Sequence, residues 1–190
     1  MKKLTYITTN PYKIEEANYY FRDKCGFNLE IINPDFEVPE IQAQTCAEVV
    51  AFSVKYAADK LGIPVLKSDS GMYLDCLGGL PGPYNAYFDK QIGEAKLLKM
   101  LENETDRKAR IEHCFGYCEP GKDPIVFAGG GTGTISKTLI GNIGSWCDFF
   151  YIPDGETKTL SILREEDYDN EAKFWGTAME DFANWYKENN

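Results

Sequence analysis

The sequence predicts a mixed α/β protein (α/β or α+β) built on one β-sheet with flanking helices. Two observations support this: helical and strand patterns alternate early in the chain, and strand patterns cluster in its middle. With 190 residues, of which 43% are hydrophobic and 26% charged, the chain is long enough for one domain with a substantial core. We therefore expect a single domain over residues 1–190, in which the clustered strands form a second lobe of hairpins.

Two helices near the N-terminus are predicted by their start signals. Asn10-Pro11 offers an N-cap residue followed by proline at the first helical position, which favours a helix to about Lys24. Thr45-Cys46-Ala47-Glu48 has the spacing of a capping box, and the helix it opens is expected to end at Gly62.

The other elements are predicted from periodicity and from turn residues. Asp69-Ser70-Gly71 is predicted to be a turn, and residues 119–122 to close a hairpin. Further helices are expected over 92–101 and over 170–187, the second with Phe174, Ala178, Phe182 and Tyr186 on one apolar face. Strands are expected at 4–8, 27–32, 64–68, 72–77, 109–117, 124–128, 133–137 and 149–152.

Charge and composition exclude several classes of function. Lys and Arg number 20 against 30 Asp and Glu, a net charge of −10, which argues against binding to a nucleic-acid polymer or an anionic membrane surface. The sequence has no signal-like leader and no long apolar run, and its six cysteines lack CxxC spacing, so a cytoplasmic location is expected. The single histidine, His113, excludes multi-histidine metal sites, and a structural role for it is favoured over a catalytic one.

A candidate phosphate site lies between the end of the first predicted strand and the start of the first predicted helix. Thr8, Thr9, Asn10 and Lys13 surround the predicted helix start, where unpaired backbone N–H groups favour anions. The same residues are also compatible with a well-capped helix that carries a solvated lysine.

Two carboxylates are candidates for metal binding. Asp69, followed by Ser70 and Gly71, is placed at the end of a strand, and Glu40 lies in a proline-containing loop. Carboxylate oxygens suit a hard cation such as Mg²⁺, and a triphosphate site needs such a cation together with a lysine. An ordinary turn at Asp69 and a surface acid at Glu40 are the alternatives.

Ordered motifs cover nearly the whole chain: Thr8–Lys13, Pro39–Gln42, Asp69–Gly71, Leu77–Tyr84, Asp106–Arg110, Gly133–Ile135 and Ile152–Gly155. Together they resemble the inosine triphosphate pyrophosphatase family, which acts on non-standard purine nucleotides. The resemblance implies an elongated central mixed sheet, two lobes around a nucleotide-binding cleft, and a homodimer. It also implies Mg²⁺-dependent hydrolysis of a nucleoside triphosphate to the monophosphate and pyrophosphate.

The resemblance also implies roles for individual residues. Lys13 and Asn10 would hold phosphates, together with Thr8, Thr9, Ser70 and Gly71 around them. Glu40 and Asp69 would hold the metal, and Asp69 would also position the attacking water, so that Asp69 and Lys13 are the catalytic residues.

The sequence departs from the family pattern at both ends of this site. Ser68 replaces the first of two acids before the Ser-Gly turn, and Ser53 stands where many members have a lysine, with Lys55 nearby. At the base-binding end, Ser145-Trp146-Cys147-Asp148-Phe149 replaces Phe-Gly-Tyr/Trp-Asp-Pro, and Lys173-Phe174-Trp175 replaces Ser-His-Arg. Asp169 falls on a family lysine.

These departures predict an altered base preference. Trp146 and Trp175 are candidates for stacking on a base, Asp148 for accepting from its edge, and Lys173 for donating to it. The main hypothesis is therefore a Mg²⁺-dependent nucleoside triphosphate pyrophosphatase. The alternative is a non-catalytic nucleotide-binding or regulatory protein of the same fold.

Overall fold

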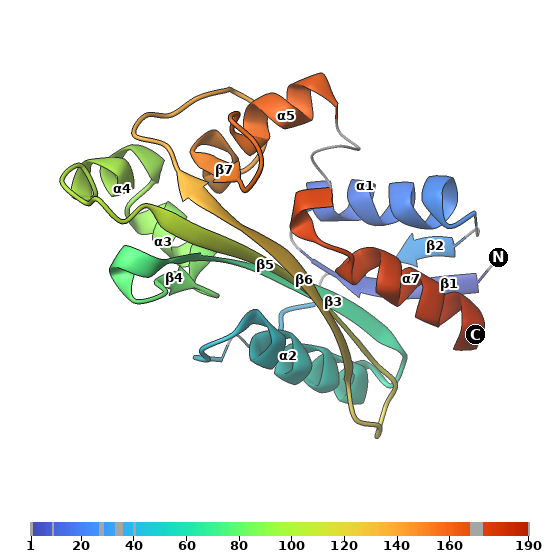
Figure 1. The fold of residues 1–190 in the computed structure, drawn as a ribbon. Helices are drawn as coiled ribbons and strands as arrows, with labels where there is room; N and C mark the ends of the chain where they lie inside the picture. Colours follow the sequence, from blue (N-terminus) through green and yellow to red (C-terminus); the bar gives the residue numbers. More distant parts are fainter. Residues whose placement is uncertain are drawn as a thin grey trace. The chain divides into compact units, whose positions relative to one another are not determined.

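A computed structural model describes residues 2–8, 10–26, 29–32, 36–39, 41–167 and 173–189. Its strands form one mixed sheet in the order β2-β1-β3-β5-β6-β7, with β4 paired antiparallel to β3 (Figure 1). β1 is parallel to both β2 and β3, whereas β6 and β7 are antiparallel, so the predicted mixed sheet is confirmed. The strands are β1 Lys2–Ile7, β2 Leu29–Ile32, β3 Val65–Leu74, β4 Pro81–Gly82, β5 Lys108–Cys118, β6 Ile125–Ile135 and β7 Tyr151–Pro153.

Six α-helices and four shorter helical turns are found among the described residues. The helices are α1 Pro11–Tyr19, α2 Cys46–Leu61, α3 Asn85–Gln91, α4 Glu94–Met100, α5 Leu160–Glu166 and α7 Ala178–Asn189. A π-turn over Tyr20–Lys24 extends α1, and 3-10 turns cover Asp75–Leu77, Trp146–Phe149 and Lys173–Trp175. None of the helices in the described ranges is long and apolar enough to cross a membrane.

The chain divides into two compact units. Unit 1 comprises residues 1–69, 113–128 and 177–190, and unit 2 comprises residues 70–112 and 129–176. The expectation of one domain over 1–190 stays a prediction. The predicted phosphate and metal residues fall in unit 1, apart from Ser70 and Gly71, and the predicted base residues fall in unit 2.

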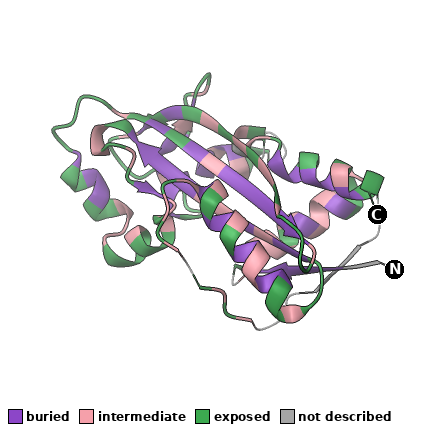
Figure 2. Ribbon diagram, turned by 90° about the horizontal axis from the view of Figure 1, so that it is seen from below, coloured by how far each residue is buried: buried purple, intermediate pink, exposed green. Residues whose placement is uncertain are grey.

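In unit 1, helices cover both faces of the strands (Figure 1). α1 and α7 pack on the face that carries Tyr6, Leu66 and Phe115, and α2 packs on the opposite face against Val65. Buried residues run along the strands, while the helices keep an exposed side (Figure 2). The approach of α2 to β5 is so close that a Cβ at Gly116 would collide with Val50, which explains a glycine in the middle of a strand.

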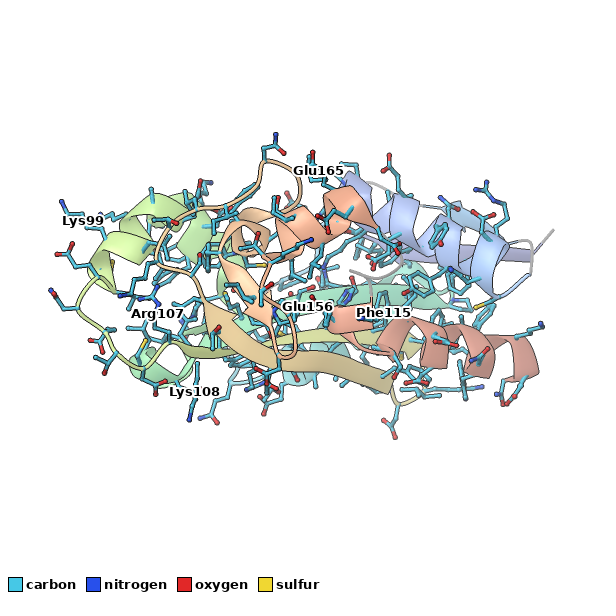
Figure 3. All side chains as sticks on the ribbon, turned by 45° about the horizontal axis from the view of Figure 1, so that its top comes forward. Lys99, Arg107, Lys108, Phe115, Glu156 and Glu165 are labelled. Carbon is cyan, nitrogen blue, oxygen red and sulfur yellow. The ribbon has the colours of Figure 1, made fainter. Side chains whose placement is uncertain are left out.

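Unit 2 has its own core, which includes Leu74, Leu97, Ile111, Phe150 and Leu160. The side chain of Arg107, labelled in Figure 3, donates to the carbonyls at the end of α4 and β6. Its partners are the oxygens of Leu101 at 3.0 Å, Ile135 at 2.8 Å and Ser136 at 2.5 Å.

The clearest error of sequence reasoning concerns β3. Asp69-Ser70-Gly71 is not a turn, because one strand runs without a break from Val65 to Leu74. The strand pairs with β1 at its start and with β4 near its end, so backbone pairing continues past the turn-forming residues. The strand predicted over 72–77 therefore ends at Leu74, and Asp75–Leu77 is a 3-10 turn.

The prediction for β6 was wrong, because its glycines indicated a break between two strands. The separate strands expected at 124–128 and 133–137 are one strand through Gly129, Gly130 and Gly131. Glycine is required there: a Cβ at Gly130 would collide with the Ile111 carbonyl, and a Cβ at Gly176 with the backbone of Gly129–Gly130. The helix predicted over 170–187 was also wrong in its extent: Gly176, with a φ of 82°, separates Lys173–Trp175 from α7.

Candidate active site

The predicted phosphate site of Thr8, Thr9, Asn10 and Lys13, the phosphate cradle, follows β1 directly. Thr8 accepts a hydrogen bond from the Asn10 backbone N–H at 3.1 Å, and the Lys13 N–H donates to the Asn10 carbonyl at 3.2 Å. Asn10 is exposed and Lys13 is half-buried. The local structure is a helix start with a lysine in its first turn, which is compatible with the predicted anion site.

Lys13 lies in the electrostatic field of Asp69. Burial lowers the pKa of the Lys13 ammonium, whereas the negative charges of Asp69 and then Glu16 raise it. The structure thus brings a residue of α1 and a residue of β3, 56 positions later in the chain, into one charged group. These are the two residues that sequence reasoning chose as catalytic.

The alternation of β3 fixes the face on which Asp69 lies. Ser68 is buried, and its hydroxyl is 2.6 Å from the hydroxyl of Tyr6, on the face covered by α1 and α7. Because successive strand residues point to opposite faces, Asp69 lies on the α2 face with Val65. Ser68, at the place of a family acid, thus has a structural hydrogen bond in this chain.

Two of the predicted site residues, Thr9 and Glu40, lie outside the described residues. The second predicted metal ligand is therefore not described. In the described part of the chain, no group of three or more His, Cys, Asp or Glu side chains is arranged to hold a metal ion.

Ser70 and Gly71 continue β3 in unit 2. The amide of Asn85, at the start of α3, bridges this stretch: it accepts from the Met72 N–H at 3.2 Å and donates to the Ser70 carbonyl at 3.5 Å. Sequence reasoning did not single out Asn85, and its signal, a lone amide after a glycine- and proline-rich loop, is weak.

Asp148 is fully buried in unit 2 and is bonded to protein groups. Its Oδ2 accepts from the Ser145 N–H at 2.7 Å and lies 3.5 Å from the guanidinium of Arg164. Burial raises the pKa of the Asp148 carboxyl, and the charge of Arg164 opposes this shift. Asp148 thus stabilises its own turn, and its predicted role as a base acceptor stays a prediction.

The other predicted base residues differ in exposure. Trp146 is 9% exposed and packs edge-on against Phe150, with ring centroids 5.3 Å apart. Lys173 is exposed, and its ammonium lies 4.6 Å from the centre of the Phe174 ring. The side chain of Trp175 lies outside what the structure describes.

Ser53 and Lys55 do not supply the family's helix lysine. Ser53 is fully buried, and its hydroxyl has no hydrogen-bond partner among the described residues. Lys55 donates to the Lys122 carbonyl at 2.9 Å and lies 3.7 Å from Asp59, so it binds the turn between β5 and β6.

His113 is buried beside Phe115, with ring centroids 4.6 Å apart. Burial, and then the positive charge of Lys13, lower the pKa of His113 from 6.5 to about 3. The imidazole is therefore neutral at physiological pH.

A neutral, buried His113 predicts a specific loss of stability in acid. Below about pH 6.5 the unfolded chain binds a proton that the folded chain does not, so stability is lost as pH falls from 6.5 towards 3. Between pH 7 and pH 5 this costs about 2 kcal/mol. Urea unfolding at pH 7 and pH 5 should show this loss of unfolding free energy in the wild type. In His113→Gln the loss between the two pH values should be smaller by about 2 kcal/mol. Equal pH slopes for the two proteins would show that His113 is not the group responsible.

Comparisons with known proteins agree with the motif resemblance. The model of the Ham1 family matches residues 4–185. The chain is 37% identical to a dITP/XTP pyrophosphatase of Methanopyrus kandleri over 98% of this chain and 97% of that protein. It is 35% identical to a dITP/XTP pyrophosphatase of Thermococcus kodakarensis, over 98% of each chain.

Solved structures show the same fold. The Ham1 protein of Staphylococcus aureus covers 100% of both chains with a TM-score of 0.83 at 24% identity. A HAM1 protein of Coxiella burnetii aligns with the same TM-score and identity over 99% of this chain and 100% of its own. The chain therefore belongs to the Ham1 family, the inosine triphosphate pyrophosphatase family that its ordered motifs resemble.

Proposed function

We propose that this protein is a nucleoside triphosphate pyrophosphatase that hydrolyses non-standard nucleoside triphosphates to the monophosphate and pyrophosphate. Family membership supports the reaction, and the M. kandleri and T. kodakarensis relatives are named for it. The observation in this chain that carries the proposal is that Lys13, in the first turn of α1, lies in the electrostatic field of Asp69.

The reaction assigns a task to each of these groups. The oxygen of a water molecule forms a bond to the α-phosphorus, and the bond between that phosphorus and the oxygen bridging to the β-phosphorus breaks. The carboxylate of Asp69 accepts a hydrogen bond from the water and orients it. The ammonium of Lys13 and the N–H groups at the start of α1 stabilise the charge that develops on the leaving pyrophosphate.

The described residues fit a hard divalent cation in part. Asp69 offers carboxylate oxygens on the α2 face of β3, and such oxygens are the ligands that Mg²⁺ prefers. We propose that Asp69 holds Mg²⁺ together with Glu40. When bound, the cation would neutralise charge on the phosphates.

The proposal includes a cytoplasmic location and a homodimer. The six cysteines are free thiols, four of them buried, as is usual in a reducing compartment. The homodimer is the assembly that the family resemblance implies, and sedimentation equilibrium would test it.

The base preference and the reaction can be tested in one assay. We expect discrimination of inosine or xanthosine triphosphate over ATP and GTP to be weak or redirected, because Lys173-Phe174-Trp175 offers one ammonium and aromatic faces. Products and kcat/KM should be measured with Mg²⁺ for inosine, xanthosine and the common triphosphates. A preference for inosine triphosphate over ATP of about 100-fold, or 2.7 kcal/mol, would contradict the expected base preference.

The same assay separates the enzyme from the non-catalytic alternative. A catalyst releases pyrophosphate and monophosphate from at least one triphosphate, and only when Mg²⁺ is present. Tight binding of a triphosphate without any release would favour a nucleotide-binding or regulatory protein of this fold.

A further inference from the structure

We propose that Lys67 is a second phosphate-binding cation, which acts together with Lys13 on the bound triphosphate. This inference rests on the proposed function and names a residue that sequence reasoning did not single out. It is carried by the position of Lys67 on β3, by the neighbouring charges, and by what the structure shows of the other lysines near α2.

The register of the sheet places Lys67 beside the cradle. Lys67 is paired with Ile7, the last residue of β1, in the parallel ladder between β1 and β3. The chain continues from Ile7 directly into Thr8 and Asn10, so Lys67 lies next to the start of the predicted phosphate loop. Its side chain is half-buried, as are those of Lys13 and Asp69.

The alternation of β3 places Lys67 and Asp69 on the same face. Ser68, between them, is bonded to Tyr6 on the face of α1 and α7. Residues two apart on a strand share a face, so Lys67 and Asp69 both lie on the α2 face, with Val65. A cation is thereby placed two residues from the carboxylate that orients water in the proposed reaction, on the same face of the strand.

Electrostatics around Lys13 agree with this placement. The pKa of Lys13 is lowered by burial first and raised by Asp69 and Glu16, and the positive charge of Lys67 lowers it further. Asp69 and Glu16 offset the repulsion between the two ammonium groups. A phosphate chain bound by both lysines would lie in the field of two positive charges, which favours a polyanion at this place.

The lysine that many family members have on α2 is missing here, and the nearby Lys55 is bound elsewhere. Ser53 is buried and uncharged, and Lys55 is held by Lys122 and Asp59 at the turn between β5 and β6. Lys67 supplies a positive charge from β3 on the face that α2 covers.

Substitutions at Lys67 test the inference with a base-free probe. Inorganic tripolyphosphate with Mg²⁺ is titrated into the wild type, Lys67→Gln, Lys67→Arg and the matched control Lys55→Gln. Lys67→Gln is expected to weaken binding about tenfold, or about 1.4 kcal/mol, because the variant loses a charge-assisted hydrogen bond to the phosphate chain. Lys67→Arg should stay within about threefold of the wild type, and Lys55→Gln should bind as the wild type does.

Kinetics and stability separate binding from a structural role. In Lys67→Gln we expect KM for the best triphosphate substrate to rise about tenfold, while kcat stays within about threefold and Tm is unchanged. Wild-type affinity for tripolyphosphate in Lys67→Gln, or an equal loss in Lys55→Gln, would overturn the inference, as would a wild type that does not bind tripolyphosphate. A wild type that binds tripolyphosphate and hydrolyses no nucleotide would overturn the proposed function, and the titration would still decide the role of Lys67.

Discussion

Asp69→Asn is expected to lower kcat for triphosphate hydrolysis by about a thousandfold, or about 4 kcal/mol, with the fold intact. Asparagine keeps the shape of the side chain and removes its negative charge. In the proposed reaction that charge orients water and is needed to hold Mg²⁺. The charge also raises the pKa of Lys13, so its loss should disturb the second catalytic residue.

The measurement compares kcat and Tm of Asp69→Asn with those of the wild type and of Asp75→Asn. Asp75 is an exposed aspartate just after β3, which makes it a matched control for a neutralised acid. Asp75→Asn should keep wild-type kcat. Activity of Asp69→Asn within about threefold of the wild type would remove Asp69 from the catalytic residues.

Lys13→Ala is expected to raise KM and to lower kcat, each by about tenfold, a loss of about 2.7 kcal/mol in kcat/KM. The ammonium serves both the bound triphosphate and the developing pyrophosphate, so both constants should change. Burial lowers the pKa of Lys13, which means that it disfavours the charged ammonium in the folded protein. Lys13→Ala removes this unfavourable contribution, so Tm should be unchanged or higher in the variant.

The control for Lys13 is Lys24→Ala at the other end of the same helical segment. The Lys24 ammonium lies 5.5 Å from the centre of the Tyr19 ring and is exposed, far along the segment from Asn10. Lys24→Ala should leave both KM and kcat unchanged. If a direct titration shows unchanged triphosphate affinity in Lys13→Ala, the cradle at Asn10–Lys13 is misplaced.

Local signals with a side-chain mechanism predicted α2 well. Thr45 and Glu48 form the expected capping box, and Gly62 ends α2 with a φ of 68°. The helices that were missed, α3 and α5, are seven residues long and begin without a side-chain cap. Nothing in their local sequence marks a start, and packing of the unit 2 core stabilises them.

Tertiary pairing overrode local turn preferences in the strands. Asp69-Ser70-Gly71 has turn chemistry, yet β3 runs through it as one strand, which pairs with β1 before this stretch and with β4 after it. Phe174 shows the same limit in a helix pattern: its spacing to Ala178 was helical, but it packs in the unit 2 core while Ala178 packs in that of unit 1.

Lys13 and Asp69 were predicted from motifs, and in the structure the charge of Asp69 raises the pKa of Lys13. Their catalytic roles stay a prediction. The position of Lys67 beside Ile7 depends on strand register, which periodicity does not fix. Asp148 and Arg164 are 16 positions apart in the chain, and packing brings them into contact. No local sequence pattern predicts this contact.

In the proposed reaction, water attacks the α-phosphorus of a nucleoside triphosphate. Hydrolysis in ¹⁸O-labelled water with Mg²⁺, followed by mass spectrometry of both products, locates the attacked phosphorus. Attack at the α-phosphorus leaves one ¹⁸O atom in the nucleoside monophosphate and none in the pyrophosphate. Label in the pyrophosphate would show attack at the β-phosphorus. Release of labelled inorganic phosphate with a nucleoside diphosphate would show attack at the γ-phosphorus. Either result would contradict attack at the α-phosphorus.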